Sequence, residues 1–129
     1  SPGRSQLAEA KNRIKEARRR HLVLARAAAK AKKLCCRHEE LLAKQKGIAE
    51  RALKLPKRKG PRMNLLAVSN AESRWLLSFA MSYAAQLKAA WAWDEVRSAQ
   101  MHLLYVCMVR ARCQLRRARV VGRCLGKML

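Results

Sequence analysis

The sequence predicts an all-α protein, an extended antiparallel hairpin of two long helices. Glycine and proline account for only 5 and 3 of the 129 residues, whereas alanine, leucine, lysine and arginine are abundant, and this composition favours long helices. Apolar residues recur at alternating steps of three and four residues in both halves of the chain, which is the spacing of one helix face. Two of the three prolines lie between residues 55 and 64, in LPKRKGPRMN, so this stretch is predicted to be the bend of the hairpin.

The first helix is expected over residues 6–54. Ser5 is a suitable N-cap, and Pro56 prevents a regular helix from continuing past Leu55. Eleven of fourteen positions on one heptad-spaced stripe are apolar and none is lysine or arginine, so this stripe is predicted to face the second helix. The stripe consists of Leu7, Ala10, Ile14, Ala17, His21, Leu24, Ala28, Ala31, Cys35, His38, Leu42, Gln45, Ala49 and Ala52.

The second helix is expected over residues 69–121. Ser69 and Glu72 fit a capping box, in which the two side chains satisfy free backbone amides at a helix start. A stripe with the same spacing, interrupted at Asp94 and Arg97, is predicted to face the first helix. It consists of Leu76, Ala80, Tyr83, Leu87, Ala90, Met101, Leu104, Met108, Ala111, Leu115 and Ala118. The alternative is a break near Trp93-Asp94, with Asp94 as the cap of a third helix.

The hairpin is expected to form one domain over residues 1–129, with a basic turn at 55–68 and a basic C-terminal tail at 122–129. Neither half can bury a self-sufficient core, which argues against two separate domains. The expected register places Leu55 opposite Ser69.

That register brings acidic side chains of the second helix beside cations of the first. Glu72 is expected near Arg51. Asp94 and Glu95 are expected near three lysines, Lys30, Lys32 and Lys33.

The charge of the chain indicates a polyanionic partner. Lysine and arginine number 30 against 8 acidic residues, a formal net charge of +22. Self-repulsion of this size destabilises a free protein unless a polyanion neutralises it. Two groups of cations are predicted to contact RNA phosphates, one where the start of the first helix meets the end of the second, and one around the bend. The residues are Lys11, Arg13, Lys15, Arg18, Arg19, Arg20, Arg110, Arg112, Arg116, Arg117, Arg119, Arg123 and Lys127 for the first group, and Lys54, Lys57, Arg58, Lys59 and Arg62 for the second.

The kind of polyanion follows from what the sequence lacks. No zinc-finger spacing, RNA-recognition strand signature or GxxG loop occurs, so base-specific recognition by one of these modules is not expected. Cations on stiff helices suffice to bind folded RNA by its shape and phosphates. In charge and helix length the chain resembles the long basic helices of ribosomal proteins, particularly small lineage-specific ones. This resemblance implies a structural role, with ribosomal RNA and neighbouring ribosomal proteins as partners.

The ribosome is expected to be mitochondrial, with a cytosolic ribosome as the alternative, because the Arg-, Ser- and Ala-rich start is compatible with a removed transit peptide. Two other functions stay open, a basic structural subunit of a mitochondrial membrane complex and a DNA-compacting protein. The first rests on the nineteen residues from Trp75 to Trp93, which resemble a membrane span with aromatic ends. Gln86 and Lys88 interrupt that segment, so no membrane contact is expected.

Three tryptophans are predicted to contact neighbouring proteins: Trp75, Trp91 and Trp93. Trp91 and Trp93 point about 200° apart on a helix, so both cannot face the same partner helix. Packing in the core between the helices and base stacking are the alternative roles for these rings.

No enzyme, cofactor, metal or small-molecule substrate is expected. The five cysteines are an odd number without scaffold spacing, which indicates free thiols. Cys35 and Cys36 point about 100° apart on a helix, while Cys35 and His38 lie on the predicted buried stripe, so a zinc site is not expected. The sequence contains no phosphate-binding glycine loop and no obvious pair of catalytic carboxylates.

Overall fold

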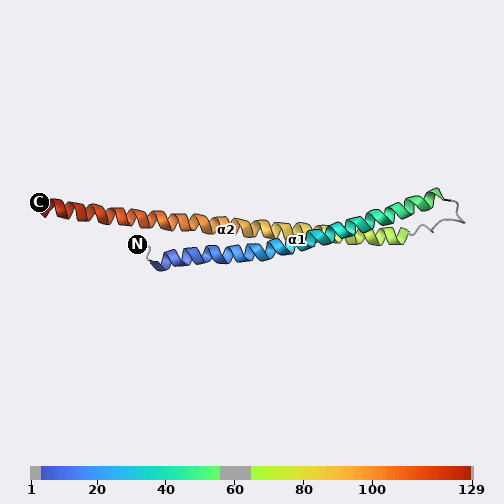
Figure 1. The fold of residues 1–129 in the computed structure, drawn as a ribbon, viewed down its shortest axis with the longest axis horizontal. Helices are drawn as coiled ribbons and strands as arrows, with labels where there is room; N and C mark the ends of the chain where they lie inside the picture. The colour runs from blue at the N-terminus through green and yellow to red at the C-terminus, as the bar shows by residue number, and fades with distance from the viewer. Residues whose placement is uncertain (1–3, 56–64, 129) are drawn as a thin grey trace. The chain divides into compact units, whose positions relative to one another are not determined.

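The computed structural model describes residues 4–55 and 65–128. Over these residues the chain forms two helices, α1 from Arg4–Lys54 and α2 from Leu65–Met128, joined as an antiparallel hairpin (Figure 1). The predicted fold class is therefore confirmed, and the bounds of α1 agree with the prediction to within two residues.

The predicted stripe of α1 is confirmed. All fourteen positions are buried or half-buried, and Ala10, Ala17 and Leu42 are among the most buried. His21 and His38 belong to this face despite their polarity, because each has a partner on α2. The Nδ1 atom of His38 donates to the carbonyl oxygen of Arg74 at 3.2 Å, and the ring of His21 lies 5.1 Å from that of Trp93.

The predicted stripe of α2 is wrong. Its large side chains are exposed, among them Leu76, Tyr83 and Met101, and a different stripe packs against α1. The buried stripe consists of Ser78, Ser82, Ala92, Val96, Ala99 and Val106.

Small side chains explain why this second stripe is the buried one. Serine, alanine and valine on α2 allow close approach to the alanine-rich stripe of α1, which leucine and tyrosine would hold further apart. The buried hydroxyls are satisfied locally, since Ser78 donates to the carbonyl oxygen of Trp75 at 3.0 Å and Ser82 accepts from the side-chain amide of Gln86 at 3.2 Å.

Both predicted ends of α2 are wrong. The helix begins at Leu65, so Ser69 and Glu72 lie inside it and form no capping box. It also continues through Gly122 and Gly126 to Met128, so the predicted tail is helical. The two glycines cost about 1 kcal/mol each relative to alanine, but only proline would block the helix, and none occurs there.

The alternative of a third helix is also excluded. α2 runs unbroken past Trp93 and Asp94. Residues 56–64 of the predicted bend lie outside the described residues. Four predicted RNA contacts fall in this stretch: Lys57, Arg58, Lys59 and Arg62.

The helices contribute to two compact units. Residues 1–22 and 91–129 make up the first unit, and residues 23–90 make up the second. In each unit a segment of α1 packs against a segment of α2. Whether the chain acts as a single domain stays a prediction.

The predicted register is wrong in both units. It would place position 20 opposite position 104, whereas Arg20 pairs with Glu95 at 3.6 Å in the first unit. In the second unit, the register would place position 38 opposite position 86, whereas His38 bonds to Arg74. The register is displaced by nine positions in the first unit and by twelve in the second, which is about two and a half to three helical turns, because α2 pairs through a different stripe from the predicted one.

One pair of substitutions tests which face of α2 is buried. We expect Ala92→Leu to destabilise the hairpin by about 1–3 kcal/mol, because Ala92 is buried in the first unit and its site has no room for three more carbons. Ala90→Leu adds the same side chain at an exposed position of the same helix, so the midpoint of thermal unfolding should be almost unchanged. Greater destabilisation by Ala90→Leu would restore the originally predicted face.

Candidate nucleic-acid interface

The end of α2 forms a helical arm beyond the start of α1. Cys113 is the last residue of α2 that lines a groove shared with the start of α1, where Gln6 lies opposite. All residues from 114 to 128, here named the C-terminal arm, are exposed, and Figure 1 shows α2 continuing past the start of α1. No other part of the described chain covers the arm.

One side of the arm, together with Arg112 just before it, is cationic. Successive cations lie four, three, four and four residues apart, so they fall within an arc of about 80° and extend about 22 Å along the helix axis. These residues, here named the basic face, are Arg112, Arg116, Arg119, Arg123 and Lys127, and all of them are exposed. The sequence contains no acidic residue after Glu95, so no carboxylate within the arm competes for these cations.

The other side of the arm is largely apolar. Ala118, Val121 and Leu125 lie on it, and they too are exposed. Arg117 points away from the basic face, while Arg110 is half-buried one turn before the arm. The predicted cluster at the end of α2 is therefore a single line of five cations with two further arginines on other sides.

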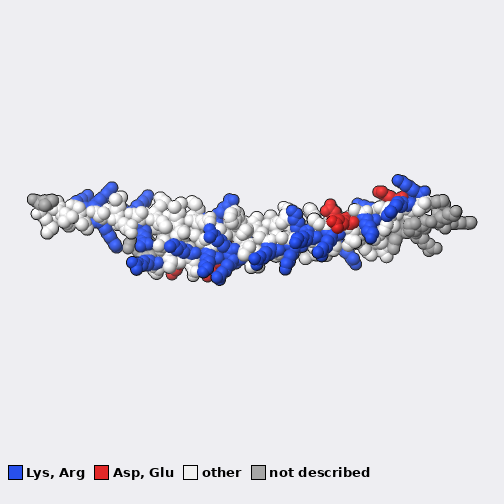
Figure 2. Space-filling view, in the orientation of Figure 1, with Lys and Arg blue, Asp and Glu red and all other residues white. Residues whose placement is uncertain are grey.

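The predicted cluster on α1 is exposed as well. Its members, Lys11, Arg13, Lys15, Arg18, Arg19 and Arg20, belong to the same compact unit as the arm, as predicted. The two clusters do not meet face to face, however, because Arg20 lies level with Glu95 and Arg13 level with His102. They follow one another along the unit, and Figure 2 shows the blue side chains of both helices. Lys54 is exposed at the end of α1.

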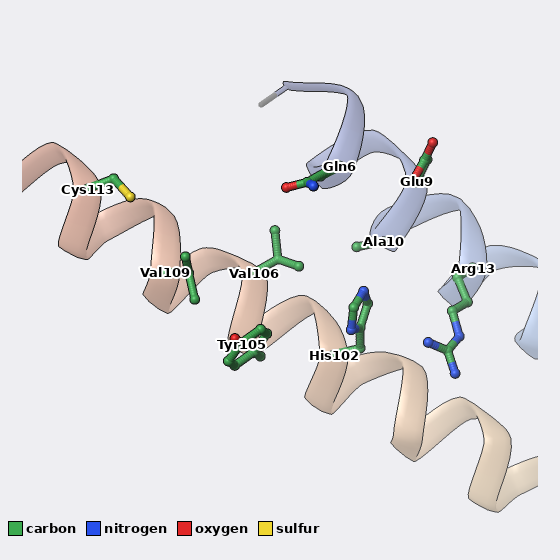
Figure 3. Close-up of a pocket in the computed structure, with 9 residues that line it drawn as sticks. All are labelled: Gln6, Glu9, Ala10, Arg13, His102, Tyr105, Val106, Val109 and Cys113. Carbon is green, nitrogen blue, oxygen red and sulfur yellow. The ribbon is translucent and has the colours of Figure 1, made fainter. Parts of the chain in front are cut away.

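A groove lies between the start of α1 and α2, and Arg13 of the α1 cluster lines it. Its volume is about 650 Å³ (Figure 3). Gln6 points into the space between the helices, Arg13 reaches towards α2, and His102 extends towards α1. The remaining lining residues are Glu9, Ala10, Tyr105, Val106, Val109 and Cys113. The groove thus combines an apolar floor with an aromatic ring and several polar side chains.

Acidic side chains neutralise little of this charge. The one ion pair among the described residues, between the Nη2 atom of Arg20 and the Oε2 atom of Glu95, joins two exposed side chains at 3.6 Å. Exposed pairs of this kind contribute at most about 1 kcal/mol. The guanidinium group of Arg97 lies 5.9 Å from the centre of the Trp93 ring, over its face.

The three predicted protein-contact tryptophans have different surroundings. Trp91 is 63% exposed, and Trp93 is 42% exposed although it packs on His21. Trp75 is half-buried and lies 5.8 Å from Phe79. Trp91 is therefore the most accessible of the three for a neighbouring molecule.

The five cysteines are free thiols, and only Cys35 is buried. Within the described ranges, no three His, Cys, Asp or Glu side chains gather closely enough to hold a metal ion. Neither α1 nor α2, as far as they are described, contains a segment long and apolar enough to cross a membrane.

Comparison with protein-family models, with characterised proteins and with solved structures finds no match to this chain. The site must therefore be understood from its own chemistry. Sequence patterns placed most of these cations on the surface, as the structure does for all described ones except the half-buried Arg110, but they missed both the groove and the lack of a partner for the arm. The sequence contained one indication that the end of α2 differs from the rest of the helix, namely the absence of acidic residues after Glu95.

Proposed function

We propose that this chain is a structural RNA-binding component of a ribonucleoprotein, namely a ribosomal subunit protein, and that the ribosome is mitochondrial. Its cations neutralise phosphates of ribosomal RNA, and its exposed apolar side chains contact neighbouring ribosomal proteins. No chemical step is part of this function.

The observation that carries the proposal is the C-terminal arm. The arm has no partner within the described chain and no acidic residue, and together with Arg112 just before it the arm aligns five cations on one side, which fits a row of phosphates better than any other common ligand. Four of the five are arginines, whose planar guanidinium groups bind phosphate oxygens through two hydrogen bonds at once.

The exposed apolar stripe of α2 supports the assembly role. In the second unit, Leu76, Phe79 and Tyr83 are each more than half exposed, while serines of the same helix face α1. Apolar side chains at helical spacing suit contact with a neighbouring protein. We propose that this stripe and Trp91 are covered in the assembled particle.

The packing of the hairpin also favours a function within an assembly. Alanine and serine bury little apolar area per residue, so the helix contacts stabilise the hairpin weakly against the entropy of ordering the backbone. The charge of +22 opposes folding further. Bound RNA would offset both effects, because a ligand that binds only the folded state stabilises it.

Sedimentation tests this proposal directly. In lysates of fractionated mitochondria and cytosol, we expect the tagged chain to sediment with ribosomal particles from mitochondria in a sucrose gradient. RNase should release it to the top of the gradient, whereas DNase should not. Release by DNase alone would indicate a DNA-compacting protein, and recovery in carbonate-resistant membranes would indicate a subunit of a membrane complex. Either result would contradict the ribosomal proposal.

A further inference from the structure

The groove and the basic face lie on one continuous side of α2. Tyr105 precedes Arg112 by seven residues, which is two helical turns, so its ring points within about 20° of the direction of that guanidinium group. Tyr105 also lines the groove, and its side chain is 64% exposed. A strand that follows the basic face towards the start of α1 therefore reaches Tyr105 and the groove next.

We propose that the groove holds an unpaired nucleotide of the RNA strand whose phosphates follow the basic face. This inference rests on the proposed RNA-binding function and adds to it a specific site and a preference for single-stranded RNA. A line of cations that ends at an exposed aromatic ring is the arrangement by which proteins bind single strands, with cations along the backbone and bases stacked on rings.

The side chains of the groove suit a nucleobase. The ring of Tyr105 provides a flat surface on which a base can stack. Ala10 and Val106 form an apolar floor between the helices. The volume of about 650 Å³ lies within the range of pockets that bind small organic ligands, so the groove has enough volume for one nucleotide.

Polar groups around the floor can pair with the edges of the base and with its sugar and phosphate. Gln6 carries both a donor and an acceptor, and the imidazole of His102 offers ring nitrogens (Figure 3). The guanidinium group of Arg13, on the opposite helix, supplies a cation for the phosphate of the bound nucleotide. Base pairing in a duplex occupies these edges and keeps the base stacked, so the groove should reject a fully paired strand.

Substitution of Tyr105 tests the proposal. Affinities are measured by fluorescence anisotropy for two labelled RNAs. One is an oligouridylate of about ten nucleotides, and the other is a fully paired RNA hairpin. We expect Tyr105→Ala to weaken binding of the oligouridylate about 5–150-fold, the loss expected when one stacking ring is removed, and to change binding of the hairpin less than twofold. Tyr105→Phe keeps the ring and should retain the affinity of the original chain.

The matched control is Tyr83→Ala. Tyr83 is a similarly exposed tyrosine of α2, but it lies in the other compact unit and does not line the groove. It should leave both affinities unchanged. Because Tyr105 is exposed, its loss should not alter the helical signal in circular dichroism, and this measurement separates a binding effect from unfolding.

The outcomes distinguish this inference from the function on which it rests. Equal losses for the two RNAs, or no loss for the oligouridylate, would overturn the nucleotide site while leaving phosphate binding by the arm intact. Failure of the original chain to bind either RNA would overturn both. As a second measurement, a 4-thiouridine placed in the oligouridylate should crosslink to the segment around His102 and Tyr105, and crosslinking confined to other segments would contradict the site.

Discussion

Replacing three arginines of the basic face, Arg116, Arg119 and Arg123, by glutamine is expected to weaken RNA binding about tenfold or more near physiological salt. The three side chains are exposed on one side of the C-terminal arm, so each can bind a separate phosphate. Every lost phosphate contact also lowers the dependence of affinity on salt. The slope of the logarithm of the association constant against the logarithm of the salt concentration should become shallower by about 2.

A matched variant separates this effect from simple loss of charge. Arg26, Arg37 and Arg51 are exposed arginines of α1 that lie outside the predicted RNA contacts, and their replacement by glutamine removes the same three charges. We expect a smaller loss of affinity and a smaller change of slope for this variant. Equal losses in the two variants would show that RNA responds to total charge and not to the basic face.

The second large effect concerns the contact between the helices. Val96 of α2 is fully buried in the first unit, where it faces the alanine-rich stripe of α1. Val96→Asp would place a carboxylate there on a side chain too short to reach water, and a buried charge without a partner costs about 3–5 kcal/mol. In a hairpin with so little buried area, we expect this substitution to abolish helix pairing and to reduce the helical signal in circular dichroism.

The control is the same substitution at an exposed valine. Val23 on α1 is 64% exposed, so Val23→Asp should leave the helical signal and the unfolding midpoint close to those of the original chain. Both variants should be measured in high salt, which screens the self-repulsion of the cations. A Val96→Asp variant as helical and as stable as Val23→Asp would show that the described face of α2 does not pair with α1.

The sequence predicted α1 well because this helix has only one apolar face. Lysine and arginine occupy its other sides, so the stripe from Leu7 to Ala52 has no competitor. α2 has two candidate faces, and the prediction chose the one with the larger side chains, such as Leu76 and Tyr83. In the structure the face with Ser78 and Val96 is the one that packs against α1, because close packing of two helices depends on the size of the side chains as well as on their hydrophobicity.

Three further features could not be predicted from sequence patterns. The register was mispredicted because it was counted from a turn over residues 55–68, whereas α2 begins at Leu65 and pairs through a different stripe. The start of α2 was mispredicted because Ser69 and Glu72 match the pattern of a capping box although they lie inside the helix. The groove depends on that register, since only the observed offset brings Gln6 and Arg13 to the level of His102 and Tyr105.

The cationic residues were predicted more reliably than their arrangement. Charge alone identified Arg112, Arg116 and Arg119 as surface residues, and the structure exposes all three. The isolation of Arg116 and Arg119 on an unpartnered arm follows from where α1 begins relative to α2, which composition does not determine. The proposed contact with RNA depends on this isolation. A carboxylate beside an arginine would neutralise its charge and so weaken its attraction to a phosphate.

The most direct test of the account is the salt dependence of RNA affinity for the unmodified chain. If five or more cations bind phosphates, the logarithm of the association constant should fall with the logarithm of salt with a slope of about −4 or steeper, and helical content should rise as RNA is added. A chain that is fully helical, compact and monomeric at low ionic strength, and whose weak affinity for RNA does not change with salt, would contradict it.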